Sequence, residues 1–423
     1  MKIIAVKIRF LGSAREVGRA AIYVKSEGSG ILLDYGVMLD HVPGFPMHVS
    51  PRDVDAIVLT HSHLDHSGAI PIFFIQDKKP VYGTELAFEF ASLLIKDFIH
   101  LSSYYLPFEI LELRSMTRSC VNLSYGVGQT VGDAEIQILN SGHLPGSGHA
   151  LLEAEGKRLL YTSDYNSAET RLLRGSNEDY GELDALIIES TYADEDHTER
   201  TTLERRFLGS VNEVVEDGGT ILVPAFSVGR SQEIACVLAA YNFEHPVTID
   251  GMAREATRII MSHMEYIKDP RLFMDAVHMA DSIEGWKDRK IVMKKPGVII
   301  SPAGMLKGGP ASFYVDKIGK KSSNAIFLVG YQIPGTPGKE LLEKGRCVID
   351  GKMRKVKAKV DFFDFSSHAG AKELKDTVKK LKGNPTIYVV HGANGNCQKF
   401  AKWINEEAGF EAKAPKPGEE YTV

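Results

Sequence analysis

Short apolar runs separated by turns characterise the first part of the chain. Ala20–Val24 and Ile31–Asp34 are expected to pair as a hairpin, because the segment between them, Ser26–Gly30, has the composition of a turn. Ala56–Leu59 is a short continuous apolar run, which is typical of a strand buried on both faces. Thr84–Phe98 has the periodicity of a helix. Further strands are predicted at Ile3–Leu11, Glu135–Leu139, Ala150–Glu153, Leu159–Thr162 and Ala185–Glu189.

From about Asp194 the pattern changes to longer units in which a strand and a helix alternate. Such alternation predicts a mostly parallel, doubly wound sheet. The helices are expected at Leu203–Val215, Ser231–Tyr241 and Arg254–His263, and the strands at Gly219–Pro224, Pro246–Ile249, Val298–Ser301 and Ala325–Val329.

After about Val360 the first pattern resumes, with strands at Val360–Phe365 and Thr386–Val390 and helices at Ala371–Leu381 and Cys397–Glu407. We therefore expect one α/β domain built from both ends of the chain, residues 1–193 and 351–423. A second α/β domain, residues 194–350, would be inserted between them. Many short strands accompanied by helices predict sheets in layers flanked by helices.

Composition supports a globular chain with two domains. The chain has 423 residues, of which 43% are hydrophobic and 25% charged. No stretch approaches the roughly 20 apolar residues that span a bilayer, and Met1–Lys7 resembles a first strand more than a secretion signal. The four cysteines are scattered, without a Cys-x-x-Cys pair, so a disulfide framework is not expected and a reducing cytoplasm fits.

Net charge does not identify a partner, because the formal value is only −5. One local exception is Lys352–Lys359, which holds five basic residues in eight positions. Two readings stay open for this segment. It is either an edge strand protected from aggregation by its lysines or a track that contacts phosphates.

Ligand-type side chains are concentrated directly after the apolar run Ala56–Leu59, where the sequence reads Thr-His-Ser-His-Leu-Asp-His. In an extended segment, residues two apart point the same way, so His61 and His63 can share one metal. Asp65 and His66 follow a turn and face another side. Four such residues exceed what one open tetrahedral zinc accepts, which predicts two metals.

The motif His-x-His-x-Asp-His resembles the central motif of the metallo-β-lactamase superfamily. Asp34, His143 and Asp164 match, in order, the acidic residue that orients the histidine loop, the third histidine ligand and the bridging aspartate of that superfamily. The resemblance implies a four-layer αββα domain.

Three later motifs are similar to those of the β-CASP branch of this superfamily. They contain Glu189 within Ile187–Tyr192, His368 within Phe365–Gly370, and His391 within Val389–Gly392. The resemblance implies that a doubly wound α/β β-CASP domain is inserted into the metallo-β-lactamase domain.

By this resemblance, one zinc ion is held by His61, His63, His143 and Asp164, and a second by Asp65, His66, Asp164 and His391. Catalytic roles fall to three residues. Asp65 would orient the nucleophile, His368 would donate a proton to the leaving oxygen, and Glu189 would fix the tautomer of His368.

The resemblance also implies a substrate. Histidine at the position of His391 is typical of members that cut RNA, so the expected activity is a zinc-dependent ribonuclease acting on single strands, with 5′-to-3′ exonuclease activity ahead of endonuclease activity. The expected products carry 5′-phosphate and 3′-hydroxyl ends. Glycines in the loop from 304 to 309 either form tight turns or bring backbone N–H groups to phosphates. The candidate substrate-binding residues are Ser301, Gly304, Gly308, Gly309, Ser366 and Ser367, the serines by similarity to the 5′-phosphate pocket of ribonuclease J.

Two other functions fit the sequence less well. A metallo-β-lactamase hydrolase of small substrates is disfavoured by the insertion, and a non-catalytic scaffold of an RNA-processing complex is disfavoured because every ligand position is filled. The chain resembles the short archaeal form without KH domains, for which family analogy suggests a homodimer or an RNA-processing complex. No metal role is expected for His41, His48, His100, His149, His197, His245, His263 and His278.

Overall fold

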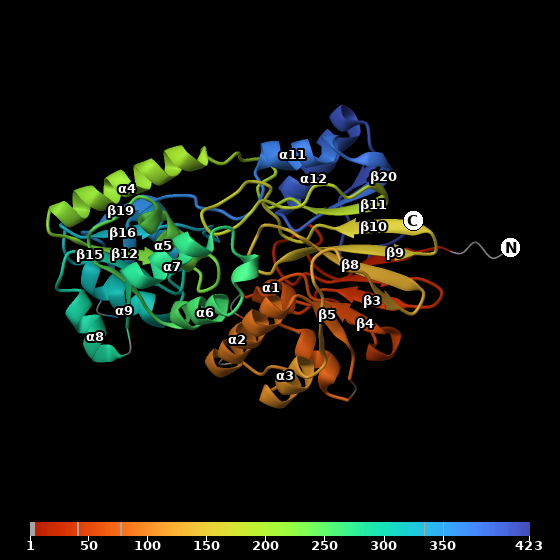
Figure 1. The fold of residues 1–423 in the computed structure, drawn as a ribbon, viewed down its shortest axis with the longest axis horizontal. Coiled ribbons are helices and arrows are strands. Elements are labelled where there is room, and N and C mark those ends of the chain that lie inside the picture. The colour runs from red at the N-terminus through yellow and green to blue at the C-terminus, as the bar shows by residue number, and fades with distance from the viewer. Residues whose placement is uncertain are drawn as a thin grey trace. The chain divides into compact units, whose positions relative to one another are not determined.

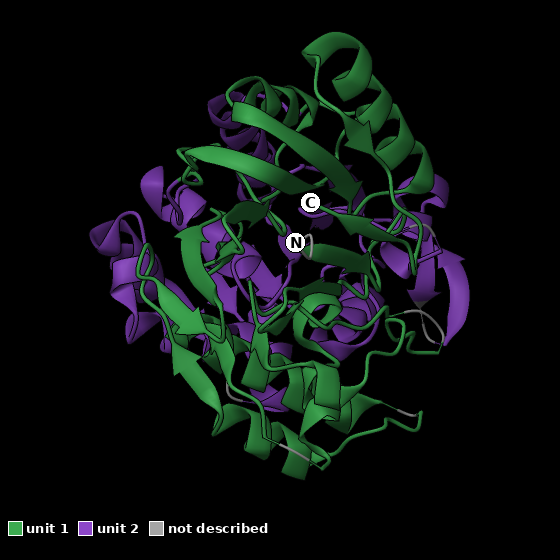
Figure 2. Cartoon of the chain, turned by 90° about the vertical axis from the view of Figure 1, so that its right-hand side faces the viewer, with its two compact units in different colours: residues 1–169, 175–196, 367–423 green, residues 170–174, 197–366 purple. Residues whose placement is uncertain are grey.

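The computed structural model describes residues 5–39, 42–76, 78–102, 104–283, 285–333, 335–349 and 351–423. The first residues of the expected strand Ile3–Leu11, and His41, lie outside this part. The chain forms two compact units (Figure 2). Unit 1 comprises residues 1–169, 175–196 and 367–423, and unit 2 comprises residues 170–174 and 197–366.

Unit 1 contains two seven-stranded sheets (Figure 1). The hairpin expected around Ser26–Gly30 is present in the first sheet, where β2 and β3 pair antiparallel. In spatial order, the first sheet consists of β22 (Glu420–Thr422), β1 (Lys7–Phe10), β2 (Ile22–Lys25), β3 (Gly30–Leu33), β4 (Ala56–Val58), β5 (Val81–Gly83) and β6 (Cys120–Asn122).

The second sheet is mixed, with an antiparallel side and a parallel side. β10, β11 and β20 run parallel to one another, and β7 to β10 form an antiparallel meander. In spatial order it consists of β21 (Ala412–Lys413), β20 (Lys382–Val390), β11 (Glu182–Glu189), β10 (Lys157–Tyr161), β9 (Gly148–Ala154), β8 (Ala134–Asn140) and β7 (Gln129–Val131).

Three apolar layers hold unit 1 together. One lies between the two sheets and includes Phe10 and Tyr388. A second joins the outer face of the first sheet to α2 and α3, and a third joins the outer face of the second sheet to α11 and α12. The expected αββα arrangement is therefore confirmed. The helices of unit 1 are α1 (Leu64–Ser67), α2 (Glu85–Leu101), α3 (Ile110–Thr117), α11 (Ala371–Lys379) and α12 (Asn394–Trp403).

Local capping fixes where some of these helices begin. Thr84 precedes α2, and its side chain accepts a hydrogen bond from the Ala87 backbone N–H, which satisfies one of the donors left open in the first turn. The helix predicted at Thr84–Phe98 is thus confirmed. Short 3-10 turns occur at Pro51–Asp53, Ile70–Phe74 and Met264–Tyr266, and a π-helical turn, Ile404–Ala408, follows α12.

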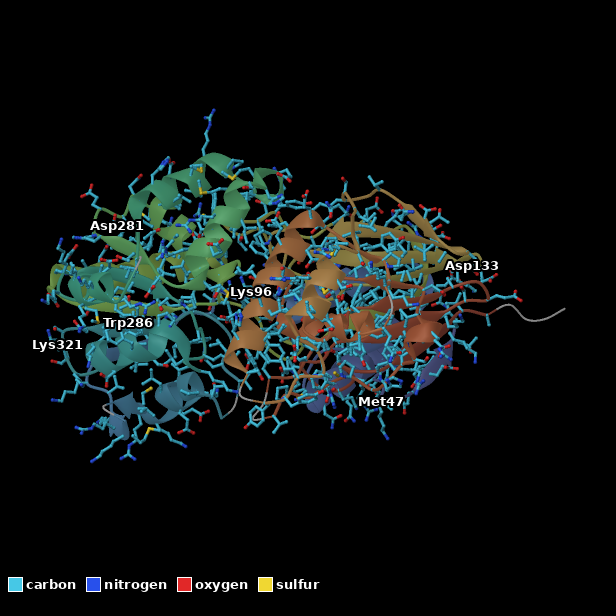
Figure 3. The ribbon with its side chains drawn as sticks, turned by 90° about the horizontal axis from the view of Figure 1, so that it is seen from below. Met47, Lys96, Asp133, Asp281, Trp286 and Lys321 are labelled. Atoms are coloured by element: carbon cyan, nitrogen blue, oxygen red, sulfur yellow. The ribbon has the colours of Figure 1, made fainter. Side chains whose placement is uncertain are left out.

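A carboxylate connects hairpins of the two sheets in unit 1. Asp133, in the turn between β7 and β8, is labelled in Figure 3. It accepts hydrogen bonds from the hydroxyls of Ser26 and Ser29 at 2.6 and 2.7 Å and from the Gly28 N–H at 3.0 Å. These three donors belong to the turn between β2 and β3, so Asp133 joins a hairpin turn of one sheet to a hairpin turn of the other.

Unit 2 is built around a six-stranded sheet in which every pairing is parallel, as the alternating pattern predicted. In spatial order it consists of β14 (Ala280–Ser282), β13 (Val247–Ile249), β15 (Gly297–Ser301), β12 (Thr220–Pro224), β16 (Ala325–Leu328) and β19 (Lys359–Phe362). The helices are α4 (Arg200–Glu216), α5 (Arg230–Ala240), α6 (Met252–Met261), α7 (Pro270–Met279), α8 (Trp286–Val292), α9 (Gly309–Ile318) and α10 (Pro337–Lys344). A separate hairpin is formed by β17 (Arg346–Ile349) and β18 (Lys352–Lys355).

One strand was assigned to the wrong domain. The segment Val360–Phe365 was expected in the domain formed by the chain ends, but β19 pairs with β16 in the sheet of unit 2. Just beyond it, Phe363 and Phe365 pack against Phe207 of α4, with ring centroids 5.3 Å apart in both pairs. An apolar run indicates a buried strand, but it does not show which strand lies next to it in the sheet.

The segment 170–174 belongs to unit 2 because a buried carboxylate holds it there. Glu233 of α5 accepts hydrogen bonds from the backbone N–H groups of Arg171 and Leu172 at 3.0 and 2.7 Å and also contacts the Arg200 guanidinium.

Among the described residues, no helix combines the length and apolar character that crossing a bilayer demands.

Candidate metal centre

The expected metal ligands gather at the carboxyl ends of strands in unit 1. Asp34 follows β3, and the segment with His61 to His66 follows β4, which runs parallel to β3. Asp164 and His391 follow β10 and β20, which run parallel with β11 between them. Because parallel strands end at the same edge of a sheet, residues far apart in the sequence meet there.

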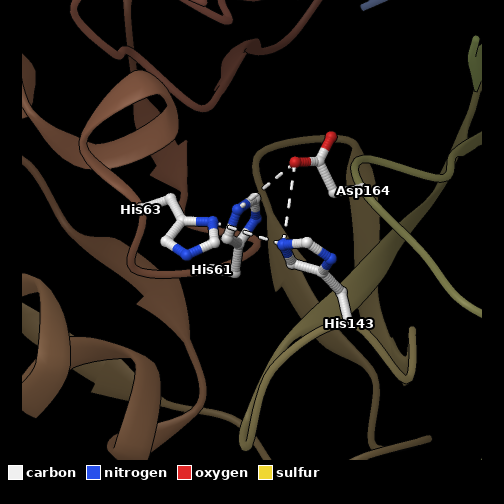
Figure 4. A group of neighbouring side chains, drawn as sticks. All are labelled: His61, His63, His143 and Asp164. Carbon is white, nitrogen blue, oxygen red and sulfur yellow. Dashed lines mark hydrogen bonds and ion pairs between the residues drawn. The ribbon is translucent and has the colours of Figure 1, made fainter. Parts of the chain in front are cut away.

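The first ligand group comprises His61, His63, His143 and Asp164 (Figure 4). Nε2 of His143 lies 3.2 Å from Nδ1 of His63. One carboxylate oxygen of Asp164, Oδ2, lies 3.7 Å from Nε2 of His61 and 3.8 Å from Nε2 of His143. Ligand atoms of all four residues lie within 4.8 Å of one another, so one ion can reach them all.

The second ligand group comprises Asp65, His66 and His391. Asp65 and His66 lie on the short helix α1, which begins directly after His63, and the His66 ring lies 4.1 Å from that of His61. Nε2 of His391 lies 3.5 Å from Asp65 Oδ2. Asp164 also reaches this group, because Oδ2 lies 3.5 Å from His66 Nε2 and Oδ1 lies 3.0 Å from His391 Nδ1. Asp164 therefore lies between the two groups.

Hydrogen bonds on the far side of the histidines orient their rings. Asp34 is fully buried and contacts Nδ1 of His66 at 2.8 Å, while it accepts hydrogen bonds from the Thr60 N–H and hydroxyl at 2.9 and 2.7 Å. Nδ1 of His143 donates to the Ser367 carbonyl at 2.8 Å. In both histidines the bond at Nδ1 leaves Nε2 as the nitrogen that carries a lone pair for a metal.

Sequence reasoning missed three polar residues of this outer layer. The hydroxyls of Thr60 and Ser163 lie 2.7 Å apart, and that of Ser163 is also 3.3 Å from His66 Nδ1. Thr191 places its hydroxyl 3.2 Å from Nδ1 of His391. Serine and threonine near a motif give no distinguishing signal, and these contacts join segments roughly a hundred or more positions apart.

Backbone strain accompanies the ligands. Asp34, Ser163 and His391 have positive φ angles of 57°, 51° and 46°, in the left-handed region that L-residues rarely adopt. Each of them closely follows the end of a strand. Such strain costs on the order of 1–3 kcal/mol per residue and is typical of functional sites, where the surrounding structure enforces it.

Burial and mutual contact shift the protonation of this cluster. Burial lowers the pKa of His61 and His143 well below the usual histidine range, and their histidine neighbours reinforce that direction. Burial opposes ionisation of Asp164, but His391 and His66 outweigh it and hold the pKa of Asp164 well below its usual value. Burial also works against charge on His391, yet contact with Asp164 raises the pKa of His391 well above 6.5. The cluster thus combines neutral imidazoles at His61 and His143 with an imidazole at His391 that keeps its proton beside Asp164.

The donor set fits divalent metal ions. Nε2 of His61, His66 and His391 is buried in each case and makes no hydrogen bond among the described residues. Buried polar atoms normally have a partner, so these ring nitrogens are suited to bind a metal ion. Imidazole and carboxylate are the ligands that zinc takes in catalytic sites, and metal binding displaces the protons that such ligands otherwise carry.

His368 and Glu189 lie beside the ligand groups as a pair. Nδ1 of His368 lies 3.1 and 3.0 Å from the two carboxylate oxygens of Glu189, which is fully buried and also accepts from the Tyr165 N–H at 2.9 Å. The His368 ring lies 4.6 Å from that of His143 and stacks near that of His391. Burial lowers the pKa of His368, but Glu189 and Asp164 outweigh this effect and the net direction is upward.

The expected substrate-binding residues belong to both units. Ser367 lies in unit 1, where its carbonyl contacts His143. The others lie in unit 2, where Ser301 is fully buried and donates its hydroxyl hydrogen bond to the Pro302 carbonyl. Gly308 and Gly309 have φ angles of 86° and 64°, so their backbone conformation alone explains why they are glycine. Contact of these residues with phosphate stays a prediction, as it does for the two remaining candidates, Gly304 and Ser366.

Three family profiles match the chain. The Metallo-beta-lactamase superfamily profile covers residues 14–185, the Beta-Casp domain profile covers residues 231–341, and the profile of the Zn-dependent metallo-hydrolase RNA specificity domain covers residues 353–415. They follow one another in the order that the sequence motifs predicted.

Similar proteins extend over nearly the whole chain. RNase aCSPSF2 of Saccharolobus solfataricus is 40% identical over 98% of this chain and 85% of its own length. The probable RNase MJ4 of Methanocaldococcus jannaschii is 34% identical over 99% of this chain and 100% of its own length. The transcription termination factor FttA of the same organism is 33% identical over 94% of this chain and 69% of its own length.

Among solved structures, a protein of unknown function from Enterococcus faecalis V583 has the same fold. Its TM-score is 0.64 at 14% identity, and the match covers 99% of this chain and 100% of that protein. The order of the profiles, the extent of the similar sequences and the ligand cluster agree with one another. The chain therefore belongs to the β-CASP family of the metallo-β-lactamase superfamily.

Proposed function

We propose that the protein is a zinc-dependent ribonuclease that hydrolyses phosphodiester bonds of single-stranded RNA, leaving 5′-phosphate and 3′-hydroxyl ends. The observation that carries the proposal is the pair of ligand groups that share Asp164. Two relatives that match over nearly the full chain are named as RNases, and one matching profile is that of an RNA specificity domain. We place 5′-to-3′ exonuclease activity ahead of endonuclease activity.

Each ligand group would hold one metal ion. His61, His63 and His143 would hold one ion with Asp164, and the second group, Asp65, His66 and His391, would hold another with the same aspartate. Two divalent ions held there would supply a nucleophile near neutral pH, because they would lower the pKa of water, and they would offset charge on the phosphate. Asp34 and the Ser367 carbonyl keep the rings of His66 and His143 in the tautomer that metal binding requires.

Asp65 would orient the attacking water molecule, and His368 would donate a proton to the leaving oxygen. The Asp65 side chain is partly exposed at 29%, unlike the other carboxylates of the cluster, so it can accept a hydrogen bond from a water molecule. Glu189 binds Nδ1 of His368, which leaves Nε2 as the nitrogen that donates a proton to the departing ribose oxygen. Glu189 is a positioning residue, since it acts through His368.

The test uses end-labelled RNA in three forms, carrying a 5′-phosphate, a 5′-triphosphate or a 5′-hydroxyl, together with DNA of the same sequence. The zinc-loaded protein should release mononucleotides from the 5′-phosphate RNA and leave the DNA intact. Internal fragments that form equally from all three RNAs would show that the protein is an endonuclease, which is the other form of the same proposal.

A matched variant excludes a contaminating nuclease. Asp164→Ala removes the shared ligand, whereas His100→Ala removes an exposed histidine at the end of α2 in the same unit. Cleavage should disappear in the first variant and persist in the second. Metal-loaded wild type that cleaves no RNA would overturn the proposal and favour a scaffold.

A further inference from the structure

The hairpin β17–β18 of unit 2 presents one face to the core and the other to solvent. Cys347 is buried at 6% exposure among residues of α9 and α10, which fixes the inward side. Side chains alternate along a strand, so its neighbours Arg346 and Val348 face outward. Their cross-strand partners, Lys355 and Met353, share that outer face.

The hairpin and the residues that follow it concentrate exposed cations. All of them are exposed, and none forms an ion pair with a carboxylate among the described residues. These residues, called the basic hairpin from here on, are Arg346, Lys352, Arg354, Lys355 and Lys357.

Neighbouring lysines of unit 2, in contrast, form ion pairs with carboxylates. On α10, which packs against the hairpin, Lys344 lies 2.7 Å from Glu340 and Lys339 lies 3.5 Å from Glu343. On the next strand, Lys359 lies 2.7 Å from a glutamate of α4. Lysines around the hairpin are thus paired with carboxylates of the fold, whereas the cations of the basic hairpin have no such partner in the described part of the chain.

The register of the hairpin makes this arrangement unfavourable for the isolated protein. Arg346 lies directly opposite Lys355 across the two strands. Like charges at directly opposed positions destabilise a hairpin. Single lysines are enough to protect an exposed edge strand from aggregation, so that role does not explain cations at opposed positions. A ligand with several negative charges along a line removes the repulsion.

We propose that the basic hairpin binds the phosphate backbone of the RNA substrate, as a contact surface separate from the ligand groups. This inference rests on the proposed function for the identity of the polyanion. RNA fits because its charges repeat along the strand, and exposed cations recur along the hairpin, from the opposed pair Arg346 and Lys355 to Lys352 near the turn. The exposed rung Val348–Met353 adjoins the Arg346–Lys355 rung on that face and offers apolar surface to a ribose or base.

The test removes three charges and keeps the rest of the hairpin. A triple variant, Arg346→Gln, Lys352→Gln and Lys355→Gln, is compared with wild type for binding of single-stranded RNA in the presence of a chelator, so that no cleavage interferes. Each phosphate contact to a single strand contributes about 0.7 to the slope of log K against log salt, so the slope should fall by about 2. Affinity at low salt should fall at least about tenfold.

The matched control removes the same number of charges elsewhere. Lys379→Gln, Lys399→Gln and Lys402→Gln change exposed lysines of unit 1 that lie 3.7–3.9 Å from carboxylates. This variant should bind RNA with the wild-type slope. Because opposed cations are removed, the hairpin variant should melt at the wild-type temperature or higher, which shows that it folds.

Cleavage separates this inference from the proposed function. With metal present, the hairpin variant should have a raised KM and an unchanged kcat, since the lost contacts bind substrate and transition state equally. Wild type that binds RNA through the hairpin but cleaves nothing overturns the ribonuclease proposal alone. Unchanged RNA affinity and salt slope in the hairpin variant overturn the inference, as does a loss that affects only binding to vesicles of anionic phospholipid.

Discussion

Asp164 lies between the two ligand groups, and its oxygens face histidines of both. We expect such single residues to decide how metal ions bind in the centre. Asp34 is comparable one layer further out, because it holds both His66 and Thr60 without belonging to either group.

Replacing Asp34 tests whether that outer layer positions the metal ligands. In Asp34→Asn the carboxylate that fixes the tautomer of His66 is lost, and we expect metal affinity or activity to fall about 10- to 100-fold. Metal titration monitored by calorimetry measures the first quantity. Asp376→Asn, on the exposed side of α11, is the control and should leave both unchanged. Wild-type metal affinity together with wild-type activity in Asp34→Asn would rule out this role.

Replacing His368 separates proton transfer from metal binding. His368→Ala should keep the full metal content and lose about 10²- to 10⁴-fold in kcat, the range for a general acid. Glu189→Gln should weaken the same step less and shift the pH profile of kcat, because the glutamate acts through the histidine. A His368→Ala protein that cleaves at the wild-type rate while fully loaded with metal would contradict the assignment.

At the scale of elements, the turn that contains Asp133 links hairpins of the two sheets in unit 1. Partial burial opposes the charge of Asp133, but hydrogen bonds from Ser26 and Ser29 hold its pKa well below its usual value. The stabilisation that this group provides is therefore fully present above the unfolded pKa of about 3.9 and is lost as the pH falls through the lower, folded pKa.

The Asp133→Asn variant should consequently differ from wild type most at neutral pH. We expect the loss of charged hydrogen bonds to cost about 1–2 kcal/mol there, with the difference shrinking below about pH 4. Hydrogen exchange of the Gly28 amide over a pH series measures the effect where it arises. A difference that grows as the pH falls would show that the sign is wrong.

Several elements could be predicted because their signals are local. The apolar run Ala56–Leu59, for example, predicted the buried strand after which the histidine motif begins. The partner of Val360–Phe365 could not be predicted, because burial specifies apolar side chains and leaves the neighbouring strand open. The members of the ligand groups could be predicted from motifs that each lie within one segment, whereas the contact between Thr60 and Ser163 depends on two segments that only the fold brings together.

At the scale of the whole molecule, metal binding should stabilise the fold. Buried ring nitrogens of the cluster that make no hydrogen bond among the described residues are unfavourable until an ion binds them. A ligand that binds only the folded state at about 100 times its Kd adds about 2.7 kcal/mol. Treatment with a chelator should therefore lower the melting temperature by several degrees, and added zinc should restore it.

A variant without the shared ligand is the control for this melting experiment. Asp164→Ala lacks the shared ligand, so its melting temperature should respond to chelator and zinc much less than that of wild type. An equal response in the two proteins would place the stabilising metal elsewhere in the chain.

The account depends most on the claim that seven side chains of unit 1 hold two ions. Crystals of the zinc-treated protein, with diffraction recorded on both sides of the zinc absorption edge, test it directly. We predict two anomalous peaks, one among His61, His63 and His143 and one among Asp65, His66 and His391, with Asp164 touching both. A single peak, no peak, or a second peak that His391 does not contact would contradict the account.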